Sequence, residues 1–329
     1  MKIIDIVNPE SAVLAEAPKP TLGSGDDVLV KVSFSALDTA FPEIASRSFG
    51  GSFLRDLKTK PLIPGWHFSG VVEEIGSDVS DLTKGDKVFG HLAYDPTNKQ
   101  GSCAEYIVVS REECAKVPDG VPMDVADAAS VEASTALQMM RDYGELDGEK
   151  KNAVLVIAAG GGVGVQAIQI AKYGFGASVV HGVCSTKDIE KVQELGADQV
   201  IDRSKSDILK DLKPGTYDVI LELSGKYNFT CLKYALKPQG TVVTSIPNVT
   251  TMLFYWAIPH LFWGKKYRSL IVQSKRTDLE LIGAWLQEGK IKSVPIDSVH
   301  RVSDIMKAWE RLEESKKDGR IVIKVDGGW

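Results

Sequence analysis

Four glycines within residues 160–164, GGGVG, form the pattern that most clearly predicts chemistry. They follow a β-branched run at 153–158, AVLVIA, and they open a helical pattern continued by Val163, Ala167, Ile170 and Ala171. A strand, a tight turn and a helix in this order bring free backbone N–H groups and the positive end of a helix dipole to one point. Such a point binds phosphate, so we expect Gly161, Gly162, Val163 and Gly164 to hold the pyrophosphate of a dinucleotide.

Individual glycines of this turn have different expected tasks. The pattern is A-x-G-G-x-G, with Ala159 where the dinucleotide fingerprint usually has its first glycine. Gly161 would let a pyrophosphate lie against the backbone, and Gly164 would let the helix pack closely on the strand. The alternative is a glycine-rich turn that serves packing alone.

The end of the next strand predicts which dinucleotide binds. The strand ASVVHGVC, 177–184, ends about 20 residues after the glycines, where an NAD enzyme offers a carboxylate to the ribose 2′-hydroxyl. Here Ser185, Thr186 and Lys187 follow instead, and Arg203 follows the third strand. Hydroxyls and cations suit a 2′-phosphate, which predicts NADPH as the cofactor. The alternative is that Lys187 merely begins a solvated helix face.

These elements belong to a chain with two textures. Up to about residue 122 it reads as short strands broken by turn residues. From 123 to 275 apolar strands alternate with helices, which indicates a parallel sheet covered on both faces. Residues 276–329 bring a last helix and a final strand-helix-strand alternation. We therefore expect an α/β fold in which a doubly wound Rossmann domain, 123–275, is inserted into a β-rich domain formed by 1–122 and 276–329.

Composition excludes several classes of protein. The 329 residues are 43% hydrophobic and 25% charged, with a formal net charge of -5, which is typical of a soluble globular chain without a nucleic-acid partner. The four cysteines show no C-x-x-C spacing, which argues against a disulfide framework and a structural zinc site. The N-terminus lacks the pattern of a signal peptide, so we expect a cytoplasmic protein.

One apolar segment, 249–263, has two interpretations. It is shorter than a membrane-spanning helix and contains Pro259 and His260, which favours a buried or pocket-lining segment. Its aromatic residues Tyr255, Trp256 and Trp263 would then form a substrate wall or ordinary core. Contact with a membrane surface is the less favoured alternative, supported by the cations that follow, Lys265, Lys266 and Arg268.

Several further motifs support a resemblance that spans nearly the whole chain. They are IPGWHFSGVVEEIGSDVSDLTKGDKVFG, GSCAEYIVV, LGADQVID and the closing DGRIVIKV. In their order and spacing the sequence resembles zinc-lacking members of the medium-chain dehydrogenase/reductase superfamily, quinone oxidoreductase-like and alkenal reductase-like. The resemblance implies a GroES-like β domain, an inserted nucleotide domain, an active site in the cleft, hydride transfer to an electron-poor carbon, and a homodimer.

The same resemblance places residues around the cofactor. Thr135, in STALQ, matches the family's threonine beside the cofactor. Ser224 and Gly225 follow the fourth strand, and Ser245 to Asn248, which include Pro247, follow the fifth. Both positions match loops that surround the nicotinamide half.

Departures from the family affect the expected mechanism. Trp66 stands where zinc-dependent relatives have a ligand histidine, and His67 stands where they have the neighbouring acid. A single histidine does not make a catalytic zinc site, so we expect no metal. Ser35 and Ala40 replace the asparagine and tyrosine of quinone reductase-like relatives, which predicts a reshaped cleft.

Without a metal, reduction of a conjugated C=C bond is easier than reduction of a carbonyl, because charge spreads into an enolate that a few donors can hold. His67 is the first candidate for a proton donor or polar anchor, and a structural histidine is the alternative. Glu132 and Ser35 are further catalytic candidates, while Asp38 matches a structural aspartate of the family.

Three functional hypotheses follow. The leading one is an NADPH-dependent reductase of a small electrophile, either a quinone or an α,β-unsaturated carbonyl. The second is a biosynthetic enoyl reductase of unknown substrate. The third is a protein that binds NADPH with little turnover and acts as a scaffold, a redox sensor or a component associated with a membrane surface.

Overall fold

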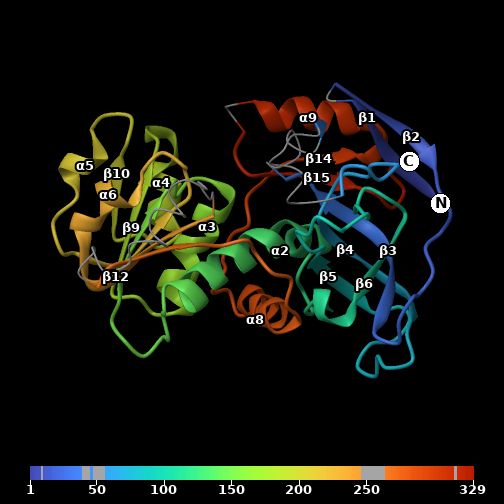
Figure 1. The fold of residues 1–329 in the computed structure, drawn as a ribbon, viewed down its shortest axis with the longest axis horizontal. Helices are drawn as coiled ribbons and strands as arrows, with labels where there is room; N and C mark the ends of the chain where they lie inside the picture. The colour runs from blue at the N-terminus through green and yellow to red at the C-terminus, as the bar shows by residue number, and fades with distance from the viewer. Residues whose placement is uncertain (9, 39–44, 47–55, 246–263, 315–316) are drawn as a thin grey trace. The chain divides into compact units, whose positions relative to one another are not determined.

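The computed structural model describes the chain except at residues 9, 39–44, 47–55, 246–263 and 315–316 (Figure 1). Pro247 and the apolar segment 249–263 thus lie outside the described residues. The chain forms two compact units: the first is Met1–Val131, Gln273–Gln287 and Val294–Trp329, and the second is Glu132–Val272 and Glu288–Ser293. An α/β unit therefore interrupts a unit that both ends of the chain complete. The domain limits at 122/123 and 275/276 stay a prediction.

The main sheet of the first unit has seven strands among the residues described, in the order β14-β15-β3-β4-β5-β7, with β6 paired to β3. The strands are β3 Asp27–Ala36, β4 His67–Ile75, β5 Lys87–His91, β6 Tyr106–Ser110, β7 Cys114–Lys116, β14 Ile296–Arg301 and β15 Arg320–Lys324. A separate antiparallel pair is formed by β1 Lys2–Asn8 and β2 Ser11–Glu16. The core of this unit includes the fully buried Trp66 and Phe68.

The last strand, β15, explains how the C-terminus completes the first unit. It pairs antiparallel with β3, with Val322 opposite Ala36, and parallel with β14. Ile321, Val322 and Ile323 are fully buried. Burying an aliphatic side chain contributes about 1.5–3 kcal/mol, so this strand is a major part of the unit's stability.

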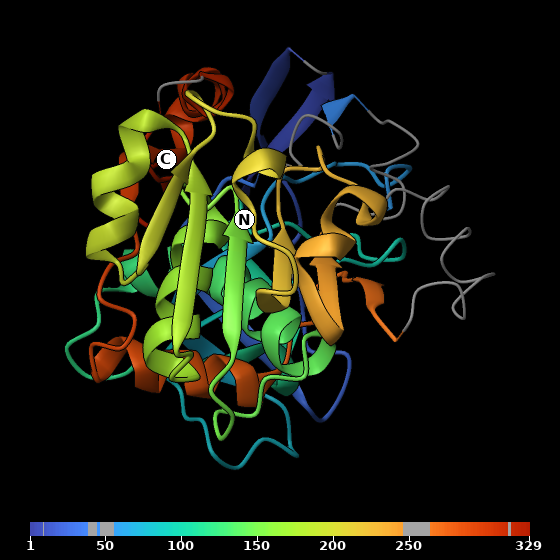
Figure 2. The same ribbon diagram turned by 90° about the vertical axis from the view of Figure 1, so that its left-hand side faces the viewer.

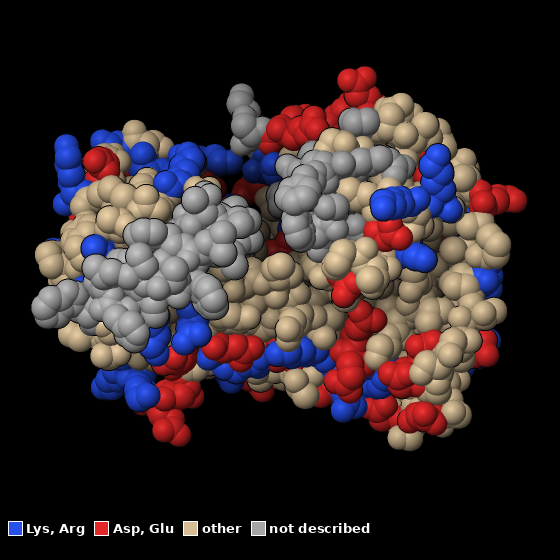
Figure 3. Space-filling model, viewed as in Figure 1, with Lys and Arg blue, Asp and Glu red and all other residues tan. Residues whose placement is uncertain are grey.

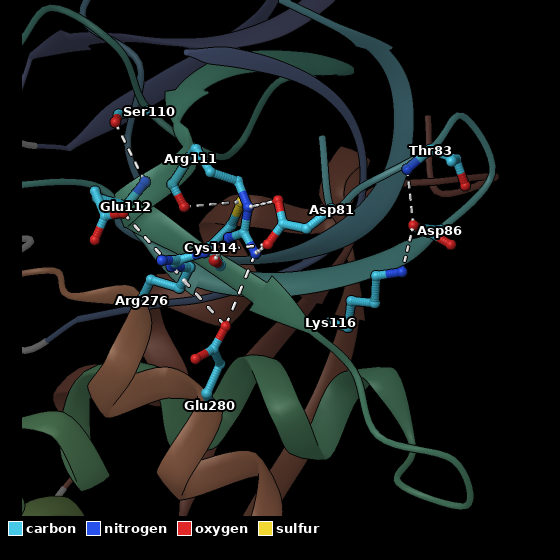
Figure 4. Close-up of polar contacts among 10 residues, drawn as sticks. All are labelled: Asp81, Thr83, Asp86, Ser110, Arg111, Glu112, Cys114, Lys116, Arg276 and Glu280. Carbon is cyan, nitrogen blue, oxygen red and sulfur yellow. Dashed lines mark hydrogen bonds and ion pairs between the residues drawn. The ribbon is translucent and has the colours of Figure 1, made fainter. Parts of the chain in front are cut away.

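Helix α8, Arg276–Gln287, is held to the first unit by a network of charges (Figure 4). Arg111 donates from Nε and Nη2 to the two carboxylate oxygens of Asp81, at 2.8 and 2.5 Å. Arg276 Nη1 lies 3.1 Å from Asp81, and Glu280 Oε1 lies 3.8 Å from Arg111. The hydrogen bond from Arg111 lowers the pKa of Asp81 to about 2, so this carboxylate is charged at neutral pH.

The second unit is built on a parallel sheet in the order β10-β9-β8-β11-β12-β13. Figure 2 shows its strands side by side. They are β8 Ala153–Ile157, β9 Val179–Cys184, β10 Gln199–Asp202, β11 Tyr217–Glu222, β12 Leu236–Thr244 and β13 Lys266–Ser269. All five residues of β8 are buried, as expected for a central parallel strand. The strand order reverses between β8 and β11, which makes this pair the switch point of a doubly wound sheet.

Helix α2, Met123–Gln138, leads from β7 of the first unit into β8, and shorter helices follow β8, β9, β10 and β11. They are α3 Gly162–Gln169, α4 Ile189–Glu194, α5 Ile208–Asp211 and α6 Phe229–Leu232, while α9 Ile305–Glu313 belongs to the first unit. The buried side chain of Gln169 holds the returning segment 288–293 to the second unit. Its Oε1 accepts from the backbone N–H groups of Lys292 and Ser293, and its Nε2 donates to Ser293 O.

Candidate active site

The glycine turn lies between β8 and α3. The backbone at Ala158 is left-handed, with φ +67°, and Ala159 N–H donates to Val183 O of β9 at 2.9 Å. Gly161 is the N-cap of α3 with extended backbone, and its carbonyl accepts from Val165 N–H at 2.9 Å. The N–H groups of the first helical turn, which includes Gly162 and Val163, have no acceptor within the helix, so they can hold an anion.

The space around two glycines of this turn differs. A Cβ atom at Gly164 would lie 2.2 Å from Ala158 O and 2.7 Å from Ala159 Cα, so the fold itself requires glycine there. A Cβ atom at Gly161 would meet, among the described residues, only Ala158 O at 3.3 Å. The surface beside Gly161 is therefore open to a ligand, which is the arrangement that a bound pyrophosphate needs.

Hydroxyls and cations gather at the ends of β9 and β10. Thr186 Oγ1 donates to Asp202 Oδ2 at 2.7 Å, and Arg203 N–H donates to Cys184 O at 2.9 Å. These bonds bring Ser185, Lys187 and Arg203 to the same edge of the sheet as the glycine turn. Lys187 and Arg203 are exposed, and Figure 3 shows Lys and Arg side chains gathered over the region where Figure 1 labels α4 and β10.

An acid that the sequence pattern does not predict also lies at this edge of the sheet. Asp188 follows the strand by four residues, but the short helical turn Thr186–Asp188 folds its carboxylate back against Gly160. Its hydrogen bonds to Ser185 and Lys191 outweigh the effect of burial and lower its pKa. The spacing from β9 gave no signal of this, because an extended exit would carry the side chain away from the turn.

A second buried acid organises the loop after β11. Glu222 is 2% exposed and pairs in register with Ile157 of β8, the strand that leads into the glycine turn. Its oxygens accept from the backbone N–H groups of Ser224 and Gly225, at 3.1 and 2.9 Å, and from the Ser224 hydroxyl. The structure thus places Ser224 and Gly225 beside the switch point. Ser245 follows β12 directly and is half-buried.

Two predicted residues lie on helix α2. Glu132 and Thr135 are both buried, and they belong to the second unit. Their separation of three residues places them on one face of the helix.

His67 lies in the first unit, fully buried at the start of β4. Arg320 Nη2 lies 2.9 Å from its Nε2, and its Nδ1 lies 3.1 Å from Asp127 O. Because a guanidinium only donates, Nε2 accepts and the ring hydrogen sits on Nδ1. Burial and the nearby charge of Arg320 lower the pKa of His67 to about 3, so the imidazole is neutral at neutral pH.

Ser35 and Trp66 also lie inside the first unit. Ser35 Oγ lies 2.7 Å from Ser102 Oγ, and both side chains are fully buried. Trp66 stacks on Tyr94 with ring centroids 5.0 Å apart, and the Tyr94 hydroxyl donates to Asp38. Asp38 Oδ2 is also 3.8 Å from His67 Nε2.

Neither a metal cluster nor a spanning helix occurs in the described part of the chain. No group of three or more His, Cys, Asp or Glu side chains there could hold a metal ion. None of the helices described is long and apolar enough to cross a membrane.

Comparison with known proteins places the chain in a family. Residues 24–119 match the alcohol dehydrogenase GroES-like domain, and residues 195–323 match the zinc-binding dehydrogenase family. The chloroplast envelope quinone oxidoreductase homolog of Arabidopsis thaliana is 33% identical over 80% of this chain and 80% of its own. The NADPH-dependent alkenal/one oxidoreductase of the same plant is 31% identical over 97% of this chain and 76% of its own.

A solved structure agrees with these matches. The quinone oxidoreductase from Coxiella burnetii superposes with a TM-score of 0.84 at 26% identity, covering 99% of both chains. The fold, the glycine turn and these relatives define the class: the chain belongs to the medium-chain dehydrogenase/reductase superfamily, in its quinone oxidoreductase-like and alkenal reductase-like group. It is an oxidoreductase, and the predicted combination of a Rossmann sheet with a GroES-like domain is confirmed.

Proposed function

We propose that this enzyme uses NADPH to reduce an electron-poor C=C bond conjugated to a carbonyl, or a quinone. The main support for this proposal is that the glycine turn lies at the same edge of the parallel sheet as the hydroxyls and cations that follow β9 and β10. The open surface at Gly161 fits a pyrophosphate, and Lys187 with Arg203 supplies positive charge for a 2′-phosphate. The printed names of the two plant relatives support a quinone or an alkenal as the substrate.

Each group of residues has a task in this proposal. When bound, the dinucleotide supplies the hydride, and an electron-poor carbon of the substrate accepts it. The helix N-terminus at Gly161, Gly162, Val163 and Gly164 holds the pyrophosphate. Thr135, Ser224, Gly225 and Ser245 surround the nicotinamide half, and the placement of Pro247 there stays a prediction from the sequence. The substrate then takes one proton, so that hydride and proton together saturate the bond.

The hydrogen bonds of His67 argue against this residue as the source of that proton. Its neutral ring donates through Nδ1 to a backbone carbonyl and accepts from Arg320 through Nε2. Both ring nitrogens of this fully buried side chain are thus occupied, so we assign His67 a structural role rather than that of a proton donor. Solvent, Glu132 or Ser35 remain the candidates for delivering the proton or holding the developing enolate.

A direct titration tests this function. NADPH and NADH are titrated into the enzyme while nicotinamide fluorescence is followed. Enones, quinones and longer conjugated acyl substrates are then added in turn while NADPH absorbance is recorded. We expect tight NADPH binding and steady oxidation by one substrate class. Binding without oxidation by any of them would favour the scaffold or sensor hypothesis, and oxidation only by longer conjugated acyl substrates would favour an enoyl reductase.

The variant Lys187→Ala separates cofactor selectivity from general binding. Loss of a cation beside the 2′-phosphate should weaken NADPH about tenfold while changing NADH little. An equal loss for both dinucleotides would show that Lys187 does not contact the 2′-phosphate.

Assembly and location are further proposals from the sequence. We propose a homodimer and a cytoplasmic location, with contact of segment 249–268 with a membrane surface as the less favoured alternative. For a chain of 35.7 kDa, light scattering of the eluted protein should give about twice that mass. Sedimentation with anionic lipid vesicles would support the membrane alternative.

A further inference from the structure

The acid that lies against the glycine turn has a built environment. A Cβ atom at Gly160 would lie 2.7 Å from Asp188 Cγ and 2.8 Å from its Oδ2. That oxygen accepts from Ser185 Oγ at 2.6 Å, and Asp188 Oδ1 lies 3.0 Å from Lys191 Nζ. The Asp188 and Lys191 side chains are 12% and 22% exposed. The pair is thus largely shielded, and its geometry is set by the turn itself.

The opposite charges of this pair lie beside the glycine turn, at the edge of the sheet where β9 ends. In doubly wound folds an acid at this edge binds the ribose 2′-hydroxyl of NAD and repels the 2′-phosphate of NADP. Asp188 supplies such an acid, although the sequence around the strand end does not predict it. Lys191 offsets its charge, so a phosphate can approach.

Other charged groups face this edge as well. Asp202 lies at the end of β10, where it accepts from Thr186 Oγ1 and from Ser204 N–H and lies 3.7 Å from Lys205 Nζ. Lys187 and Arg203 add positive charge nearby. The Asp188 carboxylate packs directly against Gly160 of the glycine turn. Its charge therefore lies close to the expected pyrophosphate site.

We propose that the Asp188–Lys191 pair sets the selectivity between NADPH and NADH, an inference that rests on the proposed function. Lys191 neutralises Asp188 and so admits the 2′-phosphate. Asp188 in turn keeps a carboxylate near the ribose, which preserves a measurable affinity for NADH.

Three variants test this proposal: Lys191→Met, Asp188→Asn and the control Lys172→Met. Lys172 forms an equivalent pair with Asp198, at 2.5 Å, but Asp198 binds the backbone of Val180 near the amino end of β9. Dissociation constants for NADPH and NADH are measured by fluorescence titration. Thermal unfolding of each variant checks that it is folded, and Asp188→Asn provides the test if Lys191→Met is not.

Opposite shifts are expected from the two test variants. Lys191→Met leaves the carboxylate unbalanced, so NADPH should weaken about tenfold and NADH less than about threefold. Asp188→Asn should raise the preference for NADPH by about three- to tenfold. Lys172→Met should change neither.

Two other results have distinct meanings. If the wild-type enzyme binds NADPH but both test variants leave the ratio of NADPH to NADH affinity unchanged, the selectivity proposal is wrong and the proposed function stands. If the wild-type enzyme binds neither dinucleotide, the proposed function itself fails, and the selectivity proposal fails with it.

Discussion

At the scale of single residues, Gly161 and Gly164 are required for different reasons. Gly164 is fixed by the fold, because any side chain would enter the backbone at Ala158 and Ala159. Gly161 faces open space among the described residues, so its requirement would come from a ligand. The fingerprint in the sequence predicts both roles. The distances from a Cβ atom built at each glycine show which role belongs to which residue.

Alanine at each glycine should therefore give different defects. Gly164→Ala, with its Cβ atom 2.2 Å from Ala158 O, should lower the free energy of unfolding by about 2 kcal/mol or more. Gly161→Ala should keep that free energy within about 1 kcal/mol of the wild type but weaken NADPH at least about tenfold. Urea unfolding and NADPH titration measure the two effects. Unchanged NADPH affinity in Gly161→Ala would show that the pyrophosphate does not bind at this turn.

The buried histidines make stability depend on pH. Burial lowers the pKa of His67 to about 3 and that of His91 to about 4, both from 6.5. Between pH 6.5 and about 4 the unfolded chain binds more protons than the folded chain. The free energy of unfolding should therefore fall as the pH is lowered through this range. Urea unfolding across this range measures the slope.

The variant His67→Gln identifies one source of that slope. It should be less stable than the wild type at neutral pH. Its free energy of unfolding should decline less steeply as pH falls, because up to about one proton fewer is taken up on unfolding. A slope equal to that of the wild type would show that His67 takes up a proton in the folded state.

At the scale of elements, Glu222 couples a strand to a loop. It ends β11, and its carboxylate holds the N–H groups of Ser224 and Gly225. Local sequence predicts β11 and the loop, since YDVILELSG combines a buried strand with a turn. It does not predict that the Glu222 side chain accepts hydrogen bonds from the loop that follows it. An acid at the end of a strand could point to either face of the sheet, and the sequence would be the same.

Replacing Glu222 should harm turnover more than a matched change on the same strand. In Glu222→Gln the amide nitrogen cannot accept the loop N–H groups, so kcat/KM should fall roughly tenfold through loss of loop order. The control is Asp218→Asn, since Asp218 accepts from Ala153 N–H at 2.7 Å near the other end of β11. Asp218→Asn should lower stability and leave kcat/KM within about twofold. An equal effect of both variants on kcat/KM would mean that Glu222 acts only on stability.

At the scale of the whole molecule, the alternation of textures along the chain correctly predicts the class of fold. Apolar runs such as β8 are buried throughout, and the glycine turn lies where the pattern places it. Contacts between distant segments could not be predicted. The parallel pairing of β14 with β15 and the capture of residues 292–293 by Gln169 depend on three-dimensional packing. The resemblance to a family, rather than periodicity, supplied the expected nicotinamide loops.

Hydride transfer from NADPH to the substrate carbon can be followed with an isotope label. The enzyme is given an enone and NADPH that carries deuterium at its transferable position, and the reduced product is examined by mass spectrometry and NMR. We expect one deuterium at the carbon β to the carbonyl and a solvent-derived hydrogen at the α carbon. A reduced product without deuterium, or NADPH binding with no reduction of any enone or quinone, would contradict this hydride transfer.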